Sequence, residues 1–505
     1  MGKRRSKTMA KEIRIEEGKL KVIFEIRDNG VVELKQFDPA GRADVRERKR
    51  ETEDFYPITE VQMTGRGSRG MHAYKHNVSG GATDFTYQSH EIVENKKGKE
   101  LVIHTATGYG VKAEYHMQFF NGVAAVQVWT VLKNEGTEAI GLEYVSSFIY
   151  QGLCQSGEKP YFEKTSVYTP HNSWDCESQW RKNDCREINL SSMAINGFNT
   201  PGFGMNRYCY GGHSSWSTCE YLPMGICEDT ECKETYFFQI EHSGQWLIEY
   251  GPSSGERLYV ALSGATEAEH GWWKNLKPGD TFTTVPAGFG VADGGVNEAI
   301  AELTGYRRKI RRPNEDDEKL NVVFNDYMNC LMGDPTEEKE KAIIDKAAEM
   351  GCEYYCLDCG WYDKGFWWDR VGEWKESPER FPNTLKAVCD YAKEKGMVMG
   401  LWLEIEVMGV ACELANKLPD DWFICRHGKR HIDNKRYLLD FRNSEVRKYC
   451  MDVVDRLIED YGVGYFKVDY NVTMGYGSDL HSDSCADAIR EHYLYLYEWY
   501  QKIFR

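Results

Sequence analysis

The stretch Gly464-Tyr-Phe-Lys-Val-Asp-Tyr-Asn471 decides how the rest of this sequence is interpreted. Its aromatic and β-branched residues predict a buried strand. On a strand, Lys467 and Asp469 lie two residues apart and therefore point to the same face. A neighbouring lysine favours an ionised carboxylate, which is the form that attacks as a nucleophile, so Asp469 is a candidate nucleophile. A structural ion pair is the alternative interpretation.

Strands alternate with helices on both sides of this stretch. The expected strands are Val322–Tyr327, Tyr354–Trp361, Val398–Met408, a short Tyr437–Phe441, and Gly464–Tyr470; the expected helices are Thr336–Met350, Asn383–Lys395, Ser444–Tyr461 and Ala486–Phe504. This alternation predicts a parallel sheet, with the candidate residues at the strand C-termini, where a (β/α)8 barrel places its active site. Four principal strands and one short strand predict only about the first half of such a barrel.

Residues 1 to about 300 predict β-structure. The expected strands are Leu20–Ile26, Val31–Phe37, Leu101–Thr105, Val111–Phe119, Val123–Val131, Tyr236–Ile240, Trp246–Tyr250 and Leu258–Leu262. Asp28-Asn-Gly30 predicts a hairpin turn between the first two. So many strands without helices indicate a large sandwich. We expect Tyr168–Cys219 to form long loops, which either line a sugar site or pack against the next domain.

A change of charge marks the boundary between these halves. Asn297–Tyr306 predicts a helix, and the basic run 307–312, Pro313 and the acidic run 315–318 follow it. Such a switch is typical of a solvated boundary. We therefore expect a multidomain β plus α/β chain, with domain 1–312 as a large β-sandwich that ends in a helix, and domain 313–505 as the N-terminal part of a (β/α)8 TIM-type barrel.

Composition excludes several classes of protein. The net charge of −16 argues against nucleic-acid binding, because phosphates would be repelled. No apolar run approaches the length of a membrane span, and no segment has the apolar core of a secretory signal. With no such signal, the 16 cysteines predict reduced thiols and a cytoplasmic location. We expect no metal and no cofactor.

Two further strand ends carry polar chemistry. Asp358 precedes a glycine turn and Trp361, and a carboxylate beside an indole suits a sugar, which offers both hydroxyl and C–H groups. Cys356-x-x-Cys359 also matches a redox or metal pattern, but the strand context and the missing second Cys or His pair argue against it.

The next strand offers Trp402, Glu404 and Glu406 on one face. Either glutamate is a candidate for acid–base work, and supporting the loops by hydrogen bonding is the alternative role. Arg436 is a candidate clamp for a hydroxyl or carboxylate, with a surface arginine as the alternative.

Five motifs, taken in order, resemble melibiase-like retaining α-galactosidases, glycoside hydrolase family 36. They are Asp358-Cys-Gly-Trp361, Gly372-Glu-Trp374 with Phe381-Pro382, Gly400-Leu-Trp-Leu-Glu-Ile-Glu406, Leu439-Asp-Phe441 before Glu445-Val446, and Lys467-Val-Asp469. The resemblance runs from Asn321 to the end of the chain. The N-terminal half looks like that family's β-supersandwich, and Leu303–Arg308 looks like its linker helix.

The resemblance implies roles for individual residues. Asp469 matches the catalytic nucleophile, and Lys467 matches the lysine that binds sugar hydroxyls. Asp358 matches the first of two aspartates on the axial-hydroxyl side of galactose. Trp402 matches a subsite tryptophan and Arg436 a hydroxyl-binding arginine, while Tyr327 stands where the family often has a tryptophan.

Three departures from the family pattern matter. Cys359 replaces the second aspartate, which weakens the case for plain galactose. The loop Thr64–Arg69 lacks the acid that the family sends toward the sugar. The family's acid/base aspartate lies in a Cys-Ser-Gly-Gly-like motif well after the nucleophile, so we expect that residue beyond residue 505 and a chain truncated at its C-terminus.

The expected function is that of an exo-acting retaining α-galactosidase-type hydrolase, which cleaves terminal α-linked galactose by double displacement. The substrate partner is a small-molecule carbohydrate, and the resemblance implies a homo-oligomer, a tetramer in the family. An α-N-acetylgalactosaminidase or a galactosyl transglycosidase is the alternative within this chemistry, and a non-catalytic carbohydrate-binding fragment is the alternative of another class. Without a partner acid, turnover is expected only with activated aryl substrates, because general acid help is worth about 10²–10⁴-fold.

Overall fold

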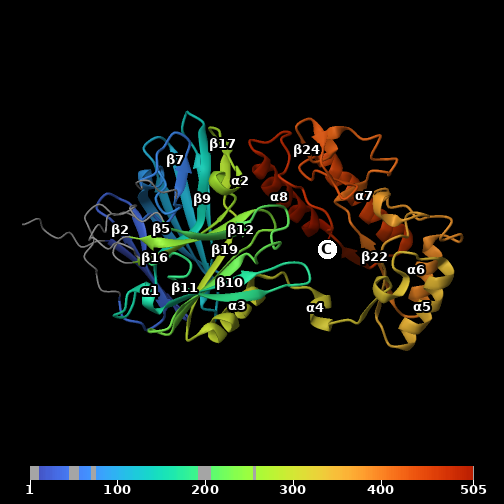
Figure 1. Ribbon diagram of the computed structural model, residues 1–505, viewed down its shortest axis with the longest axis horizontal. Helices are drawn as coiled ribbons and strands as arrows, with labels where there is room; N and C mark the ends of the chain where they lie inside the picture. Colours follow the sequence, from blue (N-terminus) through green and yellow to red (C-terminus); the bar gives the residue numbers. More distant parts are fainter. Residues whose placement is uncertain (1–10, 45–55, 70–74, 192–205, 254–256, 504–505) are drawn as a thin grey trace, which may run out of the picture. The chain divides into compact units, whose positions relative to one another are not determined.

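A computed structural model (Figure 1) describes residues 11–44, 56–69, 75–191, 206–253 and 257–503. The chain forms two compact units, Met1–Arg311 (unit 1) and Arg312–Arg505 (unit 2), and each is described by itself. The division into functional domains 1–312 and 313–505 stays a prediction. Within the described residues, no helix is both long and apolar enough to cross a membrane.

Unit 1 is built from antiparallel sheets. The largest sheet has the order β11-β10-β13-β14-β19-β8-β7-β6-β5, with β18 paired to β8. Its strands are β5 Thr86–Asn95, β6 Gly98–Ala106, β7 Val111–Phe119, β8 Ala125–Asn134, β10 Thr165–His171, β11 Gln179–Asp184, β13 Met224–Asp229, β14 Glu234–Ile240, β18 Thr281–Thr283 and β19 Ala287–Asp293.

Two smaller sheets complete unit 1. One has the order β12-β15-β16-β9-β17, with β4 paired to β9, and the other is the three-stranded sheet β1-β2-β3. Their strands are β1 Lys11–Glu17, β2 Leu20–Ile26, β3 Val32–Pro39, β4 Val61–Met63, β9 Ile140–Leu153, β12 Tyr208–Gly212, β15 Trp246–Ser253, β16 Arg257–Gly264 and β17 Lys274–Leu276.

The core of unit 1 lies between these sheets. Phe37 of β3, Phe148 of β9 and Phe289 of β19 are fully buried, and the ring centroids of Phe148 and Phe289 are 4.3 Å apart. Contacts between aromatic rings from three sheets make one continuous apolar layer. The predicted N-terminal sandwich is therefore confirmed.

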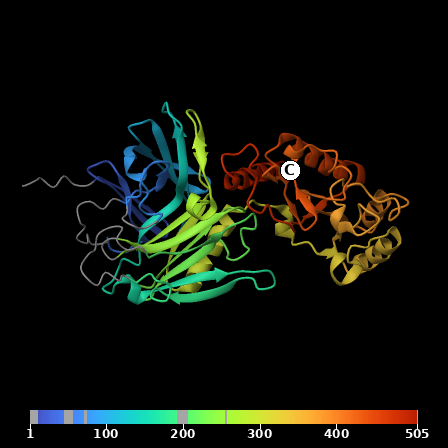
Figure 2. The same ribbon diagram turned by 45° about the horizontal axis from the view of Figure 1, so that its top comes forward.

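One part of the sequence prediction for unit 1 is wrong. Tyr168–Cys219 is not a set of long loops, because it contains the end of β10, all of β11 and all of β12, with residues 192–205 outside the described part. The β10–β11 hairpin is visible as a long two-stranded ribbon in Figure 2. The polar residues of the hairpin hid the pattern, since two of the four buried residues of β10, Thr165 and Thr169, are themselves polar.

Short helices accompany the strands of unit 1. They are α1 Tyr161–Lys164, α2 Glu267–His270 and the longer α3 Val296–Ile310. The helix α3 was predicted as Asn297–Tyr306, and it buries Ala299, Leu303 and Tyr306 against the large sheet.

Unit 2 alternates strands and helices. In its described residues the parallel sheet has the order β20-β21-β22-β28. The strands are β20 Val323–Asn325, β21 Tyr354–Leu357, β22 Val398–Leu403 and β28 Tyr465–Val468; the helices are α4 Glu315–Lys319, α5 Glu337–Glu349, α6 Leu385–Glu394, α7 Ser444–Tyr461 and α8 Cys485–Ile503. The predicted α/β organisation of this part is confirmed.

Two details of unit 2 differ from the prediction. The expected strand Val398–Met408 is broken into β22 and β23 (Val407–Gly409), because Glu404 leaves the sheet to pair with a buried arginine. The expected strand Tyr437–Phe441 is β27 (Arg436–Leu438), which pairs antiparallel with β23 and with β26 (Ile432–Asp433). The short β24 (Cys425–Arg426) and β25 (Lys429–Arg430) pair in the same excursion, which lies outside the parallel sheet.

The turn between α7 and β28 depends on a glycine. Gly462 ends α7 with φ +72°, and its N–H donates to the Ile458 carbonyl. A left-handed C-cap of this kind favours glycine, because a side chain there is strained.

We therefore predict that Gly462→Ala lowers the free energy of unfolding by about 1 kcal/mol. An added Cβ would meet no atom within 4 Å, so the cost is purely conformational. Urea denaturation measures it. Gly305→Ala in the interior of α3 is the matched substitution, and it should stabilise unit 1 by about 0.5–1 kcal/mol. If both substitutions changed the free energy of unfolding in the same direction, this account would be contradicted.

Candidate active site

The candidate residues of unit 2 gather at one edge of the parallel sheet. Asn325 ends β20, Asp358 follows β21, and Trp402 lies near the end of β22. Lys467 lies in β28, and Asp469 directly follows that strand. Carboxyl ends of parallel strands meet at the same edge, so residues up to 144 positions apart come together. The register between β22 and β28 places Trp402 opposite Lys467.

Lys467 forms its ion pair with Asp358, not with Asp469. The distance from Lys467 Nζ to Asp358 Oδ2 is 2.7 Å. Burial lowers the pKa of Lys467, but the Asp358 carboxylate and, through space, Asp469 raise it, and the net direction is upward. The lysine side chain keeps 39% of its surface exposed, so its ammonium group is the accessible end of the pair.

Asp358 is held on every side. Its Oδ2 accepts a hydrogen bond from Asn325 Nδ2 (2.7 Å) as well as from Lys467, and its Oδ1 accepts from the Cys359 N–H (2.9 Å). Its own backbone N–H donates to Asp326 Oδ1 (2.7 Å). Only 3% of Asp358 is exposed, so its carboxylate has little contact with solvent and serves to orient Lys467.

Sequence reasoning missed a buried acidic group behind Asp358. Burial raises the pKa of Asp326 to about 6 and raises that of Glu340 well above its ordinary value. The Tyr355 hydroxyl donates to Glu340 Oε2 (2.6 Å). The available signal was the position of Asp326 at a strand end and of Glu340 on the buried face of α5, four residues before Ile344.

Asp469 carries two N–H donors on its carboxylate. The Trp402 indole N–H donates to Oδ2 (3.0 Å), and the Tyr470 backbone N–H donates to Oδ1 (2.9 Å). Its own N–H donates to the Leu403 carbonyl (2.9 Å). Asp469 is thus an oriented anion beside the partly exposed Lys467.

The two glutamates after β22 face different partners. Glu404 is ion-paired with Arg436, both side chains are fully buried, and Glu404 Oε1 accepts the Asn471 N–H (2.7 Å). Burial raises the pKa of Glu404, and Arg436 opposes that rise. Glu406 instead lies 3.3 Å from Nε2 of the buried His492 of α8. Of the roles considered for Glu404, loop support fits this geometry and acid–base work does not.

Arg436 is a buried residue, so its interpretation as a surface arginine is wrong. Its guanidinium lies 3.7 Å from the centroid of the Trp368 ring, and its Nε–H donates to the Trp368 carbonyl (2.9 Å). Its Nη2 is buried with no hydrogen-bond partner among the described residues. One N–H group of this arginine is therefore left for a bound molecule or water.

Tyr327 and the cysteine motif complete the site. Tyr327 packs edge-on against Trp367 with ring centroids 6.2 Å apart, and burial raises its pKa. Cys356 and Cys359 are both buried free thiols. Burial raises the pKa of Cys356 to about 12 and also raises that of Cys359, which disfavours thiolate, redox or metal chemistry there.

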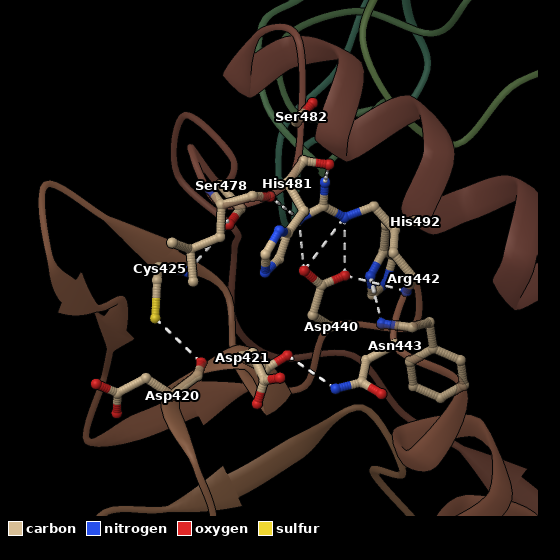
Figure 3. A network of polar contacts seen from close by, with 12 residues as sticks. Asp420, Asp421, Cys425, Asp440, Arg442, Asn443, Ser478, His481, Ser482 and His492 are labelled. Carbon is tan, nitrogen blue, oxygen red and sulfur yellow. Dashed lines mark hydrogen bonds and ion pairs between the residues drawn. The ribbon is translucent and has the colours of Figure 1, made fainter.

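The segment that follows Asp469 is fastened to the start of α7 (Figure 3). Arg442 donates to both oxygens of Asp440 and also to the Leu480 carbonyl (2.9 Å). His492 Nδ1 accepts the Phe441 N–H (3.2 Å). Upstream, Asp433 Oδ2 accepts the Thr473 N–H (2.7 Å). These contacts fix the part of the chain that follows the candidate nucleophile in the sequence.

Comparison with known proteins identifies this part of the chain. Residues 281–505 match the family model described as Melibiase. This part of the chain belongs to the melibiase family. The recognition of a melibiase-like, family 36 chain is thereby confirmed. Among curated relatives, "Alpha-galactosidase Mel36A" of Lactobacillus acidophilus is 27% identical over 465 residues, which are 89% of this chain and 59% of that protein. "Alpha-galactosidase AgaA" of Geobacillus stearothermophilus is 27% identical over 242 residues, which are 47% of this chain and 32% of that protein.

Solved structures share the fold of this chain. The crystal structure of the GH36 α-galactosidase AgaA from Geobacillus stearothermophilus superposes with a TM-score of 0.82 at 19% identity, covering 98% of this chain and 70% of that one. The galactosidase domain of AgaSK gives a TM-score of 0.80 at 17% identity, covering 98% and 69%. The sequence match thus spans about three fifths of the length of the Lactobacillus relative.

The buried Asp326 predicts a pH-dependent stability. A carboxyl whose pKa is raised from 3.8 to about 6 binds its proton more tightly in the folded state. The contribution of Asp326 to the free energy of unfolding therefore falls as pH rises from about 4 to 6 and is level above that range.

We predict that Asp326→Asn removes this fall. Urea titrations between pH 4 and 7 would measure it, as the difference between wild type and variant. Asp452→Asn, at an exposed position of α7, is the control. An Asp326→Asn variant that keeps the wild-type slope would show that Asp326 does not hold the proton.

The Glu404–Arg436 pair predicts a large stability effect. Glu404→Ala leaves the Arg436 guanidinium buried without a counter-ion, which costs about 3–5 kcal/mol. Urea denaturation of unit 2 measures the loss. Glu404→Gln is the matched control, because it still accepts the Asn471 N–H and should lose less. A cost below about 1 kcal/mol for Glu404→Ala would contradict a structural role for this glutamate.

Proposed function

We propose that the chain acts as an exo-acting retaining glycoside hydrolase that cleaves terminal α-linked galactose. The observation that carries the proposal is the oriented Asp469 carboxylate, placed at the end of β28 beside the partly exposed Lys467 in a melibiase-family sheet. The relatives described as α-galactosidases support the substrate class.

In the proposed reaction, an oxygen of Asp469 attacks the anomeric carbon. A carbon–oxygen ester bond forms, the glycosidic bond breaks, and its electron pair leaves with the departing oxygen. Lys467, which is partly exposed, donates hydrogen bonds to a sugar hydroxyl. Water then cleaves the ester. This regenerates the carboxylate and releases the sugar with its anomeric configuration retained.

The departing oxygen takes its proton from a second carboxyl group in this chemistry. Glu404 and Glu406 do not fit that role, because Arg436 and His492 engage them.

Cys359 weakens the case for plain galactose as the substrate. A buried thiol is a weak hydrogen-bond partner where the family has a carboxylate, so it would hold a sugar hydroxyl less tightly. An α-N-acetylgalactosaminide is the alternative substrate, and a non-catalytic galactose-binding chain is the alternative of another class.

We also propose a cytoplasmic location and a homo-oligomer. Cys154 and Cys227 support the first, since their sulfur atoms lie 3.7 Å apart without a disulfide. The second rests on the family resemblance.

We predict that a fluorinated α-galactosyl fluoride labels Asp469. Fluoride departs without a proton, so the first step needs no acid. Peptide mapping by mass spectrometry identifies the labelled residue, and Asp469→Asn should lose the label together with most hydrolysis of a nitrophenyl α-galactoside. Galactose binding without label indicates the non-catalytic alternative, label on another carboxylate overturns the nucleophile, and faster cleavage of the N-acetylgalactosaminide changes the substrate.

A further inference from the structure

Trp402 is too deeply buried to serve as a sugar platform. Only 1% of its surface is exposed. Tyr362 stacks against it with centroids 6.2 Å apart, Trp374 lies at 6.0 Å, and Trp367 packs edge-on at 5.5 Å. A ring that packs on a sugar needs an open face. Trp402 has no open face, so its role in the site needs another explanation.

The polar edge of the indole provides that explanation. Its N–H donates to the half-buried Asp469 Oδ2 at 3.0 Å, a normal charge-assisted hydrogen bond. The nearest cation is engaged elsewhere, because Lys467 Nζ is bonded to Asp358 Oδ2. Trp402 is thus the side-chain donor that holds this carboxylate in the described residues.

The backbone around Asp469 is fixed by the same end of β22. Asp469 N–H donates to the Leu403 carbonyl, and Asn471 N–H donates to Glu404 Oε1. Three consecutive residues, 402 to 404, therefore contact the segment 469–471. With the backbone fixed, rotation of the carboxylate is the remaining freedom, and the Trp402 and Tyr470 N–H groups restrict it.

We propose that Trp402 is a positioning residue that holds the Asp469 carboxylate in the orientation for attack. This inference rests on the proposed function. Two donors to opposite oxygens leave the carboxylate one orientation. A misplacement of about 1 Å in a reacting group costs about 10²-fold in rate.

The test uses Trp402→Phe, which keeps an aromatic ring and deletes the N–H. The readouts are the first-order rate of Asp469 labelling by the fluorinated α-galactosyl fluoride and its half-saturation concentration. We expect the rate to fall by about 10²-fold while the half-saturation concentration stays within about twofold. A misfolded fraction would lower the final amount of label but not the first-order rate, so misfolding is distinguished from a slower reaction.

Trp374→Phe is the matched control. It deletes a second indole N–H from the same cluster, and the Trp374 ring packs on Trp402 with centroids 6.0 Å apart but donates no hydrogen bond to Asp469 among the described residues. We expect its labelling rate to stay within a few-fold of wild type. A rate loss as large as that of Trp402→Phe would reduce the effect to cluster packing and overturn the proposal.

The remaining outcomes also decide. Wild-type labelling at Asp469 with an unchanged rate in Trp402→Phe overturns this inference alone. A higher half-saturation concentration with an unchanged rate would make Trp402 a sugar contact and overturn it too. An unlabelled wild-type chain overturns the proposed function and this inference with it. Independently, the indole N–H resonance of Trp402 should move in Asp469→Asn, and a stationary signal would contradict the hydrogen bond.

Discussion

The parallel pairing of β22 with β28 is the constraint on which the site of unit 2 depends. It sets Trp402 opposite Lys467 and Leu403 opposite Val468, and the chain beyond β28 is then fixed by Leu403 and Glu404. A shift of one residue would turn each side chain to the opposite face of the sheet. The indole would then no longer reach Asp469, and Lys467 would no longer reach Asp358.

Around this pairing, buried charge is neutralised stepwise from the sheet edge inward. Asp358 is held by Lys467 and Asn325, and Glu404 by Arg436, while burial raises the pKa of Asp326. The first two carboxylates are compensated by cations, and the third accepts the N–H of Asp358. Burial without one of these compensations would be costly. The groups that remain accessible, led by Lys467, are those available to a ligand.

Much of this arrangement could be predicted from sequence because it depends on local pattern. Periodicity and caps predicted α7 with its exact bounds, and the strand ends predicted that Asp358, Lys467 and Asp469 lie together. The partners could not be predicted, because two residues on one strand face need not bond to each other, and Lys467 reaches across to Asp358. The break at Glu404 was hidden for a similar reason, since Arg436 lies 32 residues away. Asp326 and Glu340 were not identified from the sequence, because burial raises their pKa values and the residue type alone does not reveal burial.

The contact between Trp402 and Asp469 joins residues 67 positions apart in the chain. Closing so long a loop costs entropy before any bond in it is gained, so such contacts form late on a folding pathway. Helices α6 and α7 can form from neighbouring residues, but the indole meets the carboxylate only after both strands have docked. The chain therefore gains an oriented carboxylate only once the sheet of unit 2 is assembled, and earlier folding intermediates have the residues of the site without its geometry.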